Sequence, residues 1–292
     1  GSEMCIRDRA NAAVNECDVL FLVGARVGDR AVKTPLALEK TTKIIHIDID
    51  PAEIGKNIGA DLPLVGDAKL VLQQMTELAK PMKHDEWIAH IKTLGGERKY
   101  VEPATGTVNP RVFIDRLAKK MPANVTVVAD VGQNQIWTCT EYKFRKEGRL
   151  LTSGGMGTMG YSVPAAIGAK MADNSRATVA ICGDGAFQMS FMELATAVQF
   201  GVDIKVVVMT NNRLGMVREL QTNGYHDRQT AVFLDGSPDF IKLAEAYGIP
   251  AMRVYDDDTM EKGVEMLAEH KGICLVEVVV DKDLSLIHIS EP

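Results

Sequence analysis

Two short motifs could together hold a divalent cation and an anionic group. Asp184 lies in a Gly-Asp-Gly sequence, and an Asn-Asn pair begins at Asn211. A carboxylate and an amide carbonyl are hard oxygen ligands that suit Mg²⁺, which completes its coordination shell with water and phosphate oxygens. The adjacent glycines leave room for a diphosphate, and a single acidic ligand leaves positive charge for the phosphates to neutralise.

The elements around these motifs predict that the two residues meet. Each follows a stretch with the apolar pattern of a buried strand, at 177–182 and 204–209, and a helix is expected between them at 187–200. The carboxyl ends of neighbouring parallel strands lie at one edge of a sheet, where α/β proteins bind ligands. Asp184 alone could be a helix cap and Asn211 alone a turn residue, so the prediction depends on the pair.

A second glycine-rich segment supports a competing interpretation. Residues 155–160 (GMGTMG) match the GxGxxG pattern of dinucleotide-binding turns, and Asp184 follows at a distance typical of a ribose-binding acid. The preceding strand at 150–152 is short, and this pattern alone is weak evidence. Dinucleotide binding is therefore the secondary interpretation.

The rest of the chain alternates apolar strands with amphipathic helices, which is typical of doubly wound parallel α/β sheets. The apolar runs at 18–24 and 43–50 predict strands that are buried on both faces. A change of composition over 81–108, with one expected helix at 84–93, marks the boundary between two such domains. Further strands are expected at 62–65, 125–129, 150–152 and 273–280, and further helices from Asp67, from Pro110 and at 163–171, 238–247 and 259–270.

Composition excludes several classes of protein. The 292 residues carry 33 basic and 39 acidic side chains, without the basic stripe that nucleic-acid binding needs. No apolar run reaches the roughly 18–20 residues of a membrane span. Five scattered cysteines without a CxxC pair predict neither a disulfide framework nor a zinc ribbon. We therefore expect a cytoplasmic protein without nucleic-acid or membrane partners.

The motifs also resemble a known family. Gly-Asp-Gly followed by Asn-Asn is similar to the signature of thiamine-diphosphate enzymes, and several further segments resemble the large, catalytic subunits of the acetolactate synthase family. The resemblance covers about residues 10–283. The segments that carry it are 130–133 (DVGQ), 151–160 (LTSGGMGTMG), 164–169 (PAAIGA) and 214–218 (LGMVR).

The resemblance implies a division of the chain into domains. Residues 10–80 would be part of a middle, FAD-associated domain, 81–108 a linker, and 109–283 the domain that binds the diphosphate of thiamine diphosphate. The tails 1–9 and 284–292 resemble translated sequencing-adapter sequence and show no pattern that fits the fold. We expect both tails to be non-native, and the chain to be a fragment without an N-terminal pyrimidine-binding domain.

The same resemblance assigns roles to residues of the larger domain. The expected Mg²⁺ ligands are Asp184, Asn211 and the backbone carbonyl of Arg213. Asn211 is expected rather than Asn212, because Thr210 replaces the first asparagine of the usual pair. The other expected contacts to the cofactor are Gly132, Gln133, Gly157, Met159, Gly183, Gly185, Ala186, Met189 and Met216.

Roles near the substrate and FAD are also implied. Residues 24–30 (GARVGDR) resemble a GARFDDR segment, in which Arg26 would approach FAD and Arg30 the substrate carboxylate. Asp48 and Asp67 would contact the adenosine part of FAD. Leu220 stands where the biosynthetic enzymes usually carry a tryptophan that shapes the acceptor site.

The activity that the resemblance implies is a carboligation. Pyruvate would lose carbon dioxide on thiamine diphosphate, and the two-carbon unit would join a second 2-oxo acid in branched-chain amino-acid biosynthesis. The full-length enzyme would be a homodimer or tetramer, with a small regulatory subunit as a further partner. No catalytic residue is assigned here, because the activating glutamate belongs to the absent domain; Glu193 and Glu219 have no assigned role.

We therefore expect the isolated chain to be inactive towards pyruvate. The alternatives are another thiamine-diphosphate-dependent decarboxylase or carboligase, and a non-catalytic domain that only binds the cofactor.

Overall fold

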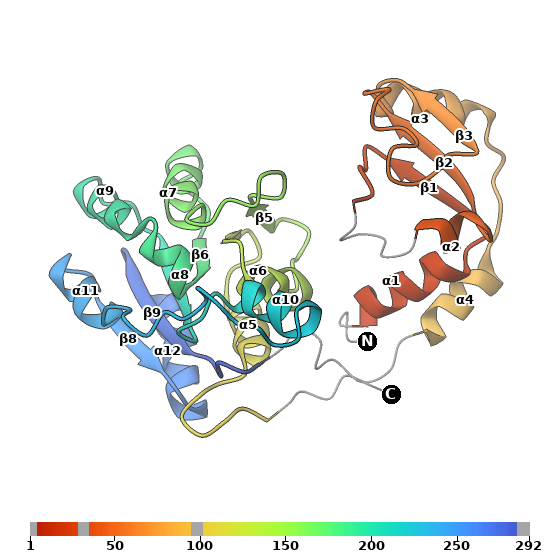
Figure 1. Cartoon of the computed structure of the whole chain (residues 1–292). Coiled ribbons are helices and arrows are strands. Elements are labelled where there is room, and N and C mark those ends of the chain that lie inside the picture. The colour runs from red at the N-terminus through yellow and green to blue at the C-terminus, as the bar shows by residue number, and fades with distance from the viewer. Residues whose placement is uncertain (1–4, 29–34, 95–101, 285–292) are drawn as a thin grey trace. The chain divides into compact units, whose positions relative to one another are not determined.

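The computed structural model describes residues 5–28, 35–94 and 102–284. The chain forms two compact units, the N-terminal unit Gly1–Glu97 and the C-terminal unit Arg98–Pro292 (Figure 1). The division between them lies within the segment 81–108. Among the described residues, no helix is both long and apolar enough to cross a membrane.

The N-terminal unit contains a three-stranded parallel sheet in the order β1-β2-β3. The central strand β2 is mostly buried, whereas residues of β1 alternate between exposed and half-buried. The prediction that this first strand is buried on both faces is wrong, since Phe21 is 48% exposed. The elements are α1 (Cys5–Glu16), β1 (Val19–Val23), α2 (Pro35–Glu39), β2 (Lys43–Asp48), β3 (Leu62–Val65), α3 (Ala68–Leu78) and α4 (Asp85–Thr93).

Helix α1 begins inside the segment expected to be a tail. Residues 5–9 show no clear periodicity, yet they form the first turns of this helix. The sequence prediction of irregular structure there is therefore wrong. The assignment of residues 1–9 to non-native sequence stays a prediction.

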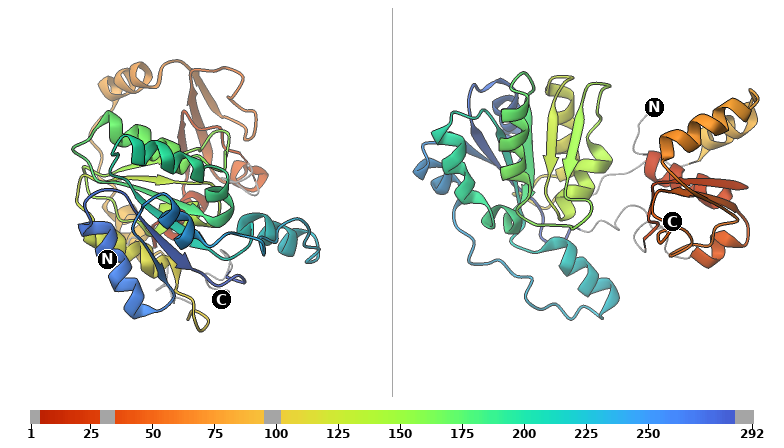
Figure 2. Two further views of the ribbon diagram at one scale, coloured as in Figure 1. Left: turned by 90° about the vertical axis from the view of Figure 1, so that its left-hand side faces the viewer. Right: turned by 90° about the horizontal axis from the view of Figure 1, so that it is seen from above.

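The C-terminal unit contains a six-stranded parallel sheet in the order β5-β4-β6-β7-β9-β8. Helices cover both of its faces, as Figure 2 shows, so the expected parallel α/β fold is confirmed. The strands are β4 (Thr126–Ala129), β5 (Arg149–Thr152), β6 (Thr178–Gly183), β7 (Lys205–Thr210), β8 (Ala251–Val254) and β9 (Cys274–Val279).

Alternating residues of the central strands build two separate cores. Ile181 and Val207 belong to the core beneath α5 (Pro110–Lys120), α6 (Gln133–Glu141) and α12 (Asp257–Glu269). Ala180 and Val206 belong to the core beneath α7 (Ser162–Ala172), α9 (Leu194–Gln199) and α11 (Phe240–Ala246). Because both faces are covered, β6 and β7 are apolar along most of their length, as the sequence predicts.

The helix expected at 187–200 is divided. The structure has α8 (Asp184–Gln188), the short 3₁₀ helix η1 (Phe191–Glu193) and α9 in its place. The interruption is a tight turn in which the N–H groups of Met189 and Ser190 donate to Ala186 and Phe187, three residues back. At its other end, α8 starts at Asp184, directly after β6.

Of the helices that the structure describes in the C-terminal unit, α6 and α10 (Gly215–Gly224) were absent from the sequence expectations, as were α1 and α2 in the N-terminal unit. Helices α6 and α10 both bury polar side chains, including Gln133 and Glu141 in α6 and Glu219 in α10, so their apolar periodicity is interrupted. Each of these two helices follows a strand of the C-terminal sheet and begins at the carboxyl edge of that sheet.

The strand order places a topological switch point at this edge. Strand β4 leads through α6 to β5 on one side, and β5 returns through α7 to β6 on the other side of β4. The chain therefore leaves the end of β4 towards one edge of the sheet and leaves the end of β6 towards the other edge, so a crevice opens between these two strand ends. Open parallel sheets bind ligands in the crevice at such a point.

Candidate functional site

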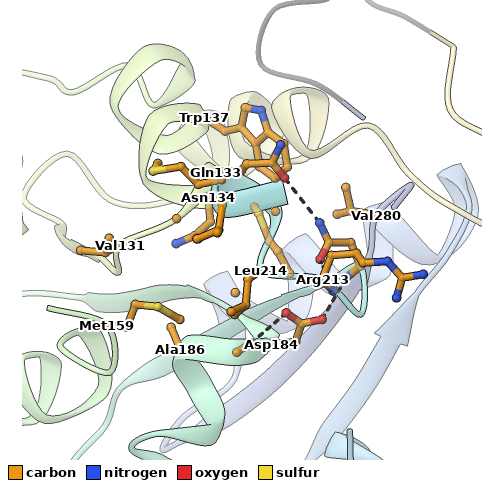
Figure 3. A pocket seen from close by; sticks show the side chains of 18 residues that line it. Val131, Gln133, Asn134, Trp137, Met159, Asp184, Ala186, Arg213, Leu214 and Val280 are labelled. Atoms are coloured by element: carbon orange, nitrogen blue, oxygen red, sulfur yellow. Dashed lines mark hydrogen bonds between the residues drawn. The ribbon is translucent and has the colours of Figure 1, made fainter. Parts of the chain in front are cut away.

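A pocket occupies the switch point of the C-terminal sheet (Figure 3). It is formed by the segments that follow β4, β6 and β7, together with Met159 and Val280. Of the residues expected at the site, the pocket lining includes Gly132, Gln133, Met159, Gly183, Asp184, Gly185, Ala186, Asn211, Arg213 and Met216.

Asp184 is the central acidic group of this pocket and is only 1% exposed. Its Oδ1 accepts the N–H of Gly185 at 2.8 Å, and its Oδ2 accepts the N–H groups of Asn211 at 3.1 Å and Asn212 at 2.6 Å. The carboxylate therefore links the ends of β6 and β7. Burial raises the pKa of Asp184 to about 6, although the backbone hydrogen bonds oppose this shift.

Asn211 lines the same pocket as Asp184, to which its backbone N–H donates. Its Oδ1 accepts the backbone N–H of Arg213 at 3.0 Å, and its Nδ2 donates to Oε1 of Gln133 at 3.4 Å (Figure 3). Gln133 is buried, and its Nε2 donates to Oε2 of Glu219 and to the carbonyl of Leu284, each at 3.1 Å. Asn211, in the pocket lining, is thus hydrogen-bonded to Gln133, which is hydrogen-bonded in turn to the buried Glu219.

The backbone of Arg213 is held in a defined orientation. Arg213 forms an isolated antiparallel bridge with Phe233, in which Leu214 N–H donates to Val232 and Leu234 N–H donates to Asn212. Since Asn212 and Leu214 make these bonds, the N–H and carbonyl of Arg213, which lies between them, point away from the segment 232–234.

The side chain of Arg213 is engaged away from Asp184. Its guanidinium donates to Asp235 at 2.8 Å and lies over the Phe233 ring at 4.6 Å. The guanidinium is therefore not a counter-charge for Asp184, so an anion in the pocket needs another source of positive potential.

Glycines keep the floor of the pocket open. A Cβ added at Gly185 would lie 2.7 Å from Cδ2 of Leu214, and one added at Gly132 would lie 2.5 Å from Oδ1 of Asn134. Gly132 also has a φ of +147°, which L residues rarely adopt. A side chain at either position would displace the neighbouring Leu214 or Asn134 side chain, and at Gly132 the backbone conformation also favours glycine.

Asp130 fixes the glycine-rich segment that borders the pocket. This fully buried carboxylate accepts the N–H of Gly160 at 3.0 Å and that of Ser162 at 2.7 Å, as well as the N–H of Val131. Met159, next to Gly160, therefore lines the pocket from a segment that is held by hydrogen bonds to Asp130. The GxGxxG segment thus reaches this pocket through Met159, and none of its glycines is part of the lining.

Other expected residues lie outside the pocket lining. Gly157 has a φ of +63°, and a Cβ added there would have no heavy atom within 4 Å. Met189 is 59% exposed and packs on Gly160 through its Cβ, and Leu220, on α10, is 47% exposed. None of these three contributes to the lining.

The expected FAD contacts lie in the N-terminal unit. Arg26, Asp48 and Asp67 follow or end β1, β2 and β3, so they share the carboxyl edge of that sheet. The carboxylate of Asp48 accepts the N–H of Asp50 at 2.9 Å, and that of Asp67 caps α3 through Leu70 at 3.1 Å. Arg30 lies outside the described residues.

Several lining residues had no role in the sequence assignments. Trp137 and Asn134 lie on α6, and Leu214 and Val280 supply apolar surface. Glu219, to which no role was given, is buried behind the pocket and accepts from Gln133. No local sequence pattern marks Glu219, because its contact with Gln133 joins residues 86 apart in the chain.

The arrangement suits a cation bound by mixed oxygen ligands. Among the described residues there is no group of three or more histidine, cysteine, aspartate and glutamate side chains that could hold a metal. A site at Asp184 therefore needs amide and carbonyl oxygens as well, which Mg²⁺ accepts. Helix α6 begins at the pocket with Gln133, and its N–H groups and dipole favour an anion there.

Comparisons with known proteins agree with this arrangement. Residues 130–278 match the family described as "Thiamine pyrophosphate enzyme, C-terminal TPP binding domain". Residues 2–75 match the family described as "Thiamine pyrophosphate enzyme, central domain".

Individual relatives are similar over nearly the whole chain. The acetolactate synthase large subunit of Lactococcus lactis is 36% identical over 275 residues, which cover 94% of this chain and 48% of the relative. The isozyme 3 large subunit of Escherichia coli is 35% identical over 93% of this chain and 49% of its own length. A probable large subunit from Methanocaldococcus jannaschii is 38% identical, over 93% of this chain and 48% of the relative.

The chain thus spans about half the length of the curated relatives it matches. The C-terminal match includes Asp130, Asp184 and Asn211, whose contacts build the pocket. The central-domain match falls on the N-terminal unit. The chain therefore belongs to the thiamine pyrophosphate enzyme family.

Proposed function

We propose that the pocket of the C-terminal unit binds Mg²⁺ together with the diphosphate of thiamine diphosphate. The carboxylate of Asp184, the side-chain oxygen of Asn211 and the backbone carbonyl of Arg213 would hold the metal. The observation that carries this proposal is the buried Asp184 carboxylate, which shares its Oδ2 with the backbone of Asn211 and Asn212. Among the described residues no cationic side chain pairs with Asp184; a buried carboxylate in this state is costly, and a bound cation would offset that cost.

The donor set and the shape of the pocket fit this pair of ligands. One carboxylate among neutral oxygens leaves net positive charge on Mg²⁺, which the diphosphate can neutralise. The N-terminus of α6 offers backbone N–H groups to the same anion, and the absence of a Cβ at Gly132 and Gly185 lets it approach the backbone.

Thiamine diphosphate supplies, when bound, the carbon nucleophile that attacks a 2-oxo acid. The residues of this chain would bind, orient and shield it. Met159 and Leu214 line the pocket near Asp184 with apolar groups that limit access of water, and Asp130 holds the segment that carries Met159. Electrostatic contacts are stronger in such a low-dielectric environment.

For the complete protein we propose an acetolactate synthase-type carboligation. The relatives are named acetolactate synthase large subunits, which supports this reaction, with pyruvate and a second 2-oxo acid as substrates. "Large subunit" also supports a small-subunit partner. A homodimer or tetramer, like cytoplasmic localisation, stays a prediction.

FAD binding is a separate proposal for the N-terminal unit. Arg26, Asp48 and Asp67 share one sheet edge, which supports a common ligand, although both carboxylates already accept local backbone N–H groups. Titration of the purified chain with FAD, followed by quenching of flavin fluorescence, tests it. An unchanged flavin signal at saturating protein would contradict the proposal.

The metal–diphosphate proposal is tested by calorimetry with thiamine diphosphate and Mg²⁺. We expect wild-type protein to bind both ligands together, and Asp184→Ala to weaken Mg²⁺ binding by more than about 100-fold, because a direct ligand matters more than an outer-shell contact. Asp258→Ala, which changes an exposed aspartate on α12, is the matched control and should bind like wild type. Equal affinity of wild type and Asp184→Ala would refute the assignment.

A further inference from the structure

Glu219, a buried residue of α10, is connected to the pocket through Gln133. Its Oε2 accepts the Nε2 hydrogen of Gln133 at 3.1 Å, and Gln133 in turn accepts from Asn211 through Oε1 at 3.4 Å. Glu219 is 7% exposed and Gln133 is 4% exposed. The three side chains come from α10, α6 and the end of β7, and they form a path that runs from the interior to the proposed metal site.

The acceptors around Gln133 determine which way its amide faces. Its Nε2 lies between two oxygens, the carboxylate of Glu219 and the carbonyl of Leu284, each at 3.1 Å. A carboxylate and a backbone carbonyl only accept hydrogen bonds, so rotating the amide by 180° would place its oxygen against both. Oε1 of Gln133 must therefore face Asn211.

The orientation of Gln133 then determines that of Asn211. Because Oε1 can only accept, the group of Asn211 that faces it must be the Nδ2 amine. Oδ1 of Asn211 is thereby turned to the other side, where it accepts the N–H of Arg213 at 3.0 Å. A carbonyl oxygen has two lone pairs, so this Oδ1 keeps one for a cation beside Asp184.

We propose that Glu219 is a positioning residue for the metal site, which acts through Gln133 to present the oxygen of Asn211, and not its amine, to Mg²⁺. The inference rests on the proposed function of the pocket. It assigns a role to Glu219, which does not itself line the pocket. A reversed Asn211 would direct an N–H donor at the cation and lose one ligand.

The isosteric change Glu219→Gln separates this role from a packing role. A glutamine of the same size can either donate or accept, so the charged acceptor that orients Gln133 is lost and only the carbonyl of Leu284 still orients its amide, while the packing is kept. We expect Mg²⁺ affinity, measured by calorimetry at saturating thiamine diphosphate, to fall by about tenfold, as changes in outer-shell partners of metal ligands typically do. Glu245→Gln, on the exposed face of α11, is the matched control for the lost charge and should bind like wild type.

A double-mutant cycle tests whether the effect passes through Gln133. Gln133→Met keeps the length of the side chain and removes both amide atoms, so in this background Glu219→Gln should change Mg²⁺ affinity by less than about twofold. Urea unfolding of each variant without metal confirms that the fold is retained. If one variant does not fold, the amide ¹⁵N resonances of Gln133 and Asn211 in wild-type protein still report whether their NH₂ groups are hydrogen-bonded and held.

The outcomes separate the two proposals. Wild-type affinity in Glu219→Gln, or an equal loss in the Gln133→Met background, would overturn the positioning role while leaving the metal site intact. Freely rotating NH₂ groups of Gln133 and Asn211 would overturn it as well. If wild-type protein and Asp184→Ala bind Mg²⁺ equally, the proposed function itself fails, and the inference fails with it.

Discussion

The two parallel sheets of this chain place acidic residues at equivalent edges but use them differently. At the edge of the C-terminal sheet, Asp130 and Asp184 are buried and each accepts backbone N–H groups from more than one segment. At the edge of the N-terminal sheet, the carboxylates of Asp48 and Asp67 each accept from a residue two or three positions ahead.

This difference follows from how completely each sheet is covered. Helices bury both faces of β6 and β7, so polar groups at their ends must find partners within the protein. Strand β1 keeps an exposed face, and no residue of α3 is buried. The carboxylates of Asp130 and Asp184, which follow the buried strands β4 and β6, therefore join distant segments, and they preorganise the pocket of the C-terminal unit.

The largest effect is expected from Asp130→Ala. The change leaves the N–H groups of Gly160 and Ser162 without their buried acceptor, and we expect a loss of about 4 kcal/mol in the free energy of unfolding of the C-terminal unit. Asp48→Ala removes an acceptor of one local N–H and should cost about 1 kcal/mol in its own unit. Urea unfolding can follow each unit by its single tryptophan, Trp137 or Trp87. Equal losses would remove the contrast between the edges.

A matched pair of isoleucines tests the contribution of apolar packing. Ile181 in β6 is fully buried, so Ile181→Ala should cost about 3 kcal/mol of unfolding free energy through lost burial and a cavity. Ile49, which follows β2, is 70% exposed, and Ile49→Ala should cost less than about 0.5 kcal/mol. The same denaturant titrations measure both. A cost above about 2 kcal/mol for Ile49→Ala would show that its side chain is covered in solution.

The pH dependence of Mg²⁺ binding should report the buried carboxylate. Mg²⁺ and a proton compete for Asp184, whose pKa is raised to about 6 by burial. Affinity is therefore expected to be nearly constant above about pH 7 and to fall by about tenfold between pH 7 and pH 5, since the ionised fraction falls by that factor. Calorimetry of Asp184→Asn provides the control, because any pH dependence it retains belongs to the cofactor. A flat wild-type profile over this range would contradict the assignment.

The smallest difference between the two units is expected from replacing one glycine in each, since the two losses of stability should be equal. Gly55 and Gly248 have φ values of +73° and +70°, and neither has a heavy atom within 4 Å of an added Cβ. Replacing either glycine by alanine should therefore cost only the backbone strain, about 1 kcal/mol. Thermal unfolding of the two variants checks this. A clearly larger cost at Gly248 would show that coverage of the sheet also affects its connecting turns.

The sequence predicts most of the C-terminal unit, since strands buried on both faces carry strong apolar runs. The predicted strand at 204–209 corresponds to β7 within one residue at each end, and the spacing of Asp184 and Asn211 correctly indicates that they meet. The prediction of burial on both faces fails at β1, because an apolar run does not show whether a helix covers it.

The parts of the site that the sequence does not reveal are those that depend on tertiary contacts. Gln133 and Glu219 belong to helices whose buried polar residues interrupt the apolar pattern, so neither α6 nor α10 is predicted. Their contact joins positions 86 residues apart in the chain. No local pattern encodes such a contact, and it becomes visible only when both helices begin at the same edge of the sheet.

The hydrogen bonds of Asp184 have a consequence for how the protein opens. Because Oδ2 accepts from Asn211 and Asn212, the pocket exists only while β6 and β7, the central strands of the sheet, remain paired. The amides of Asn211 and Asn212 should consequently exchange with solvent only in the global opening of the C-terminal unit, and a ligand held at Asp184 would make that opening rarer throughout the sheet. The binding site and the most stable cooperative unit of the native state would then be one structure.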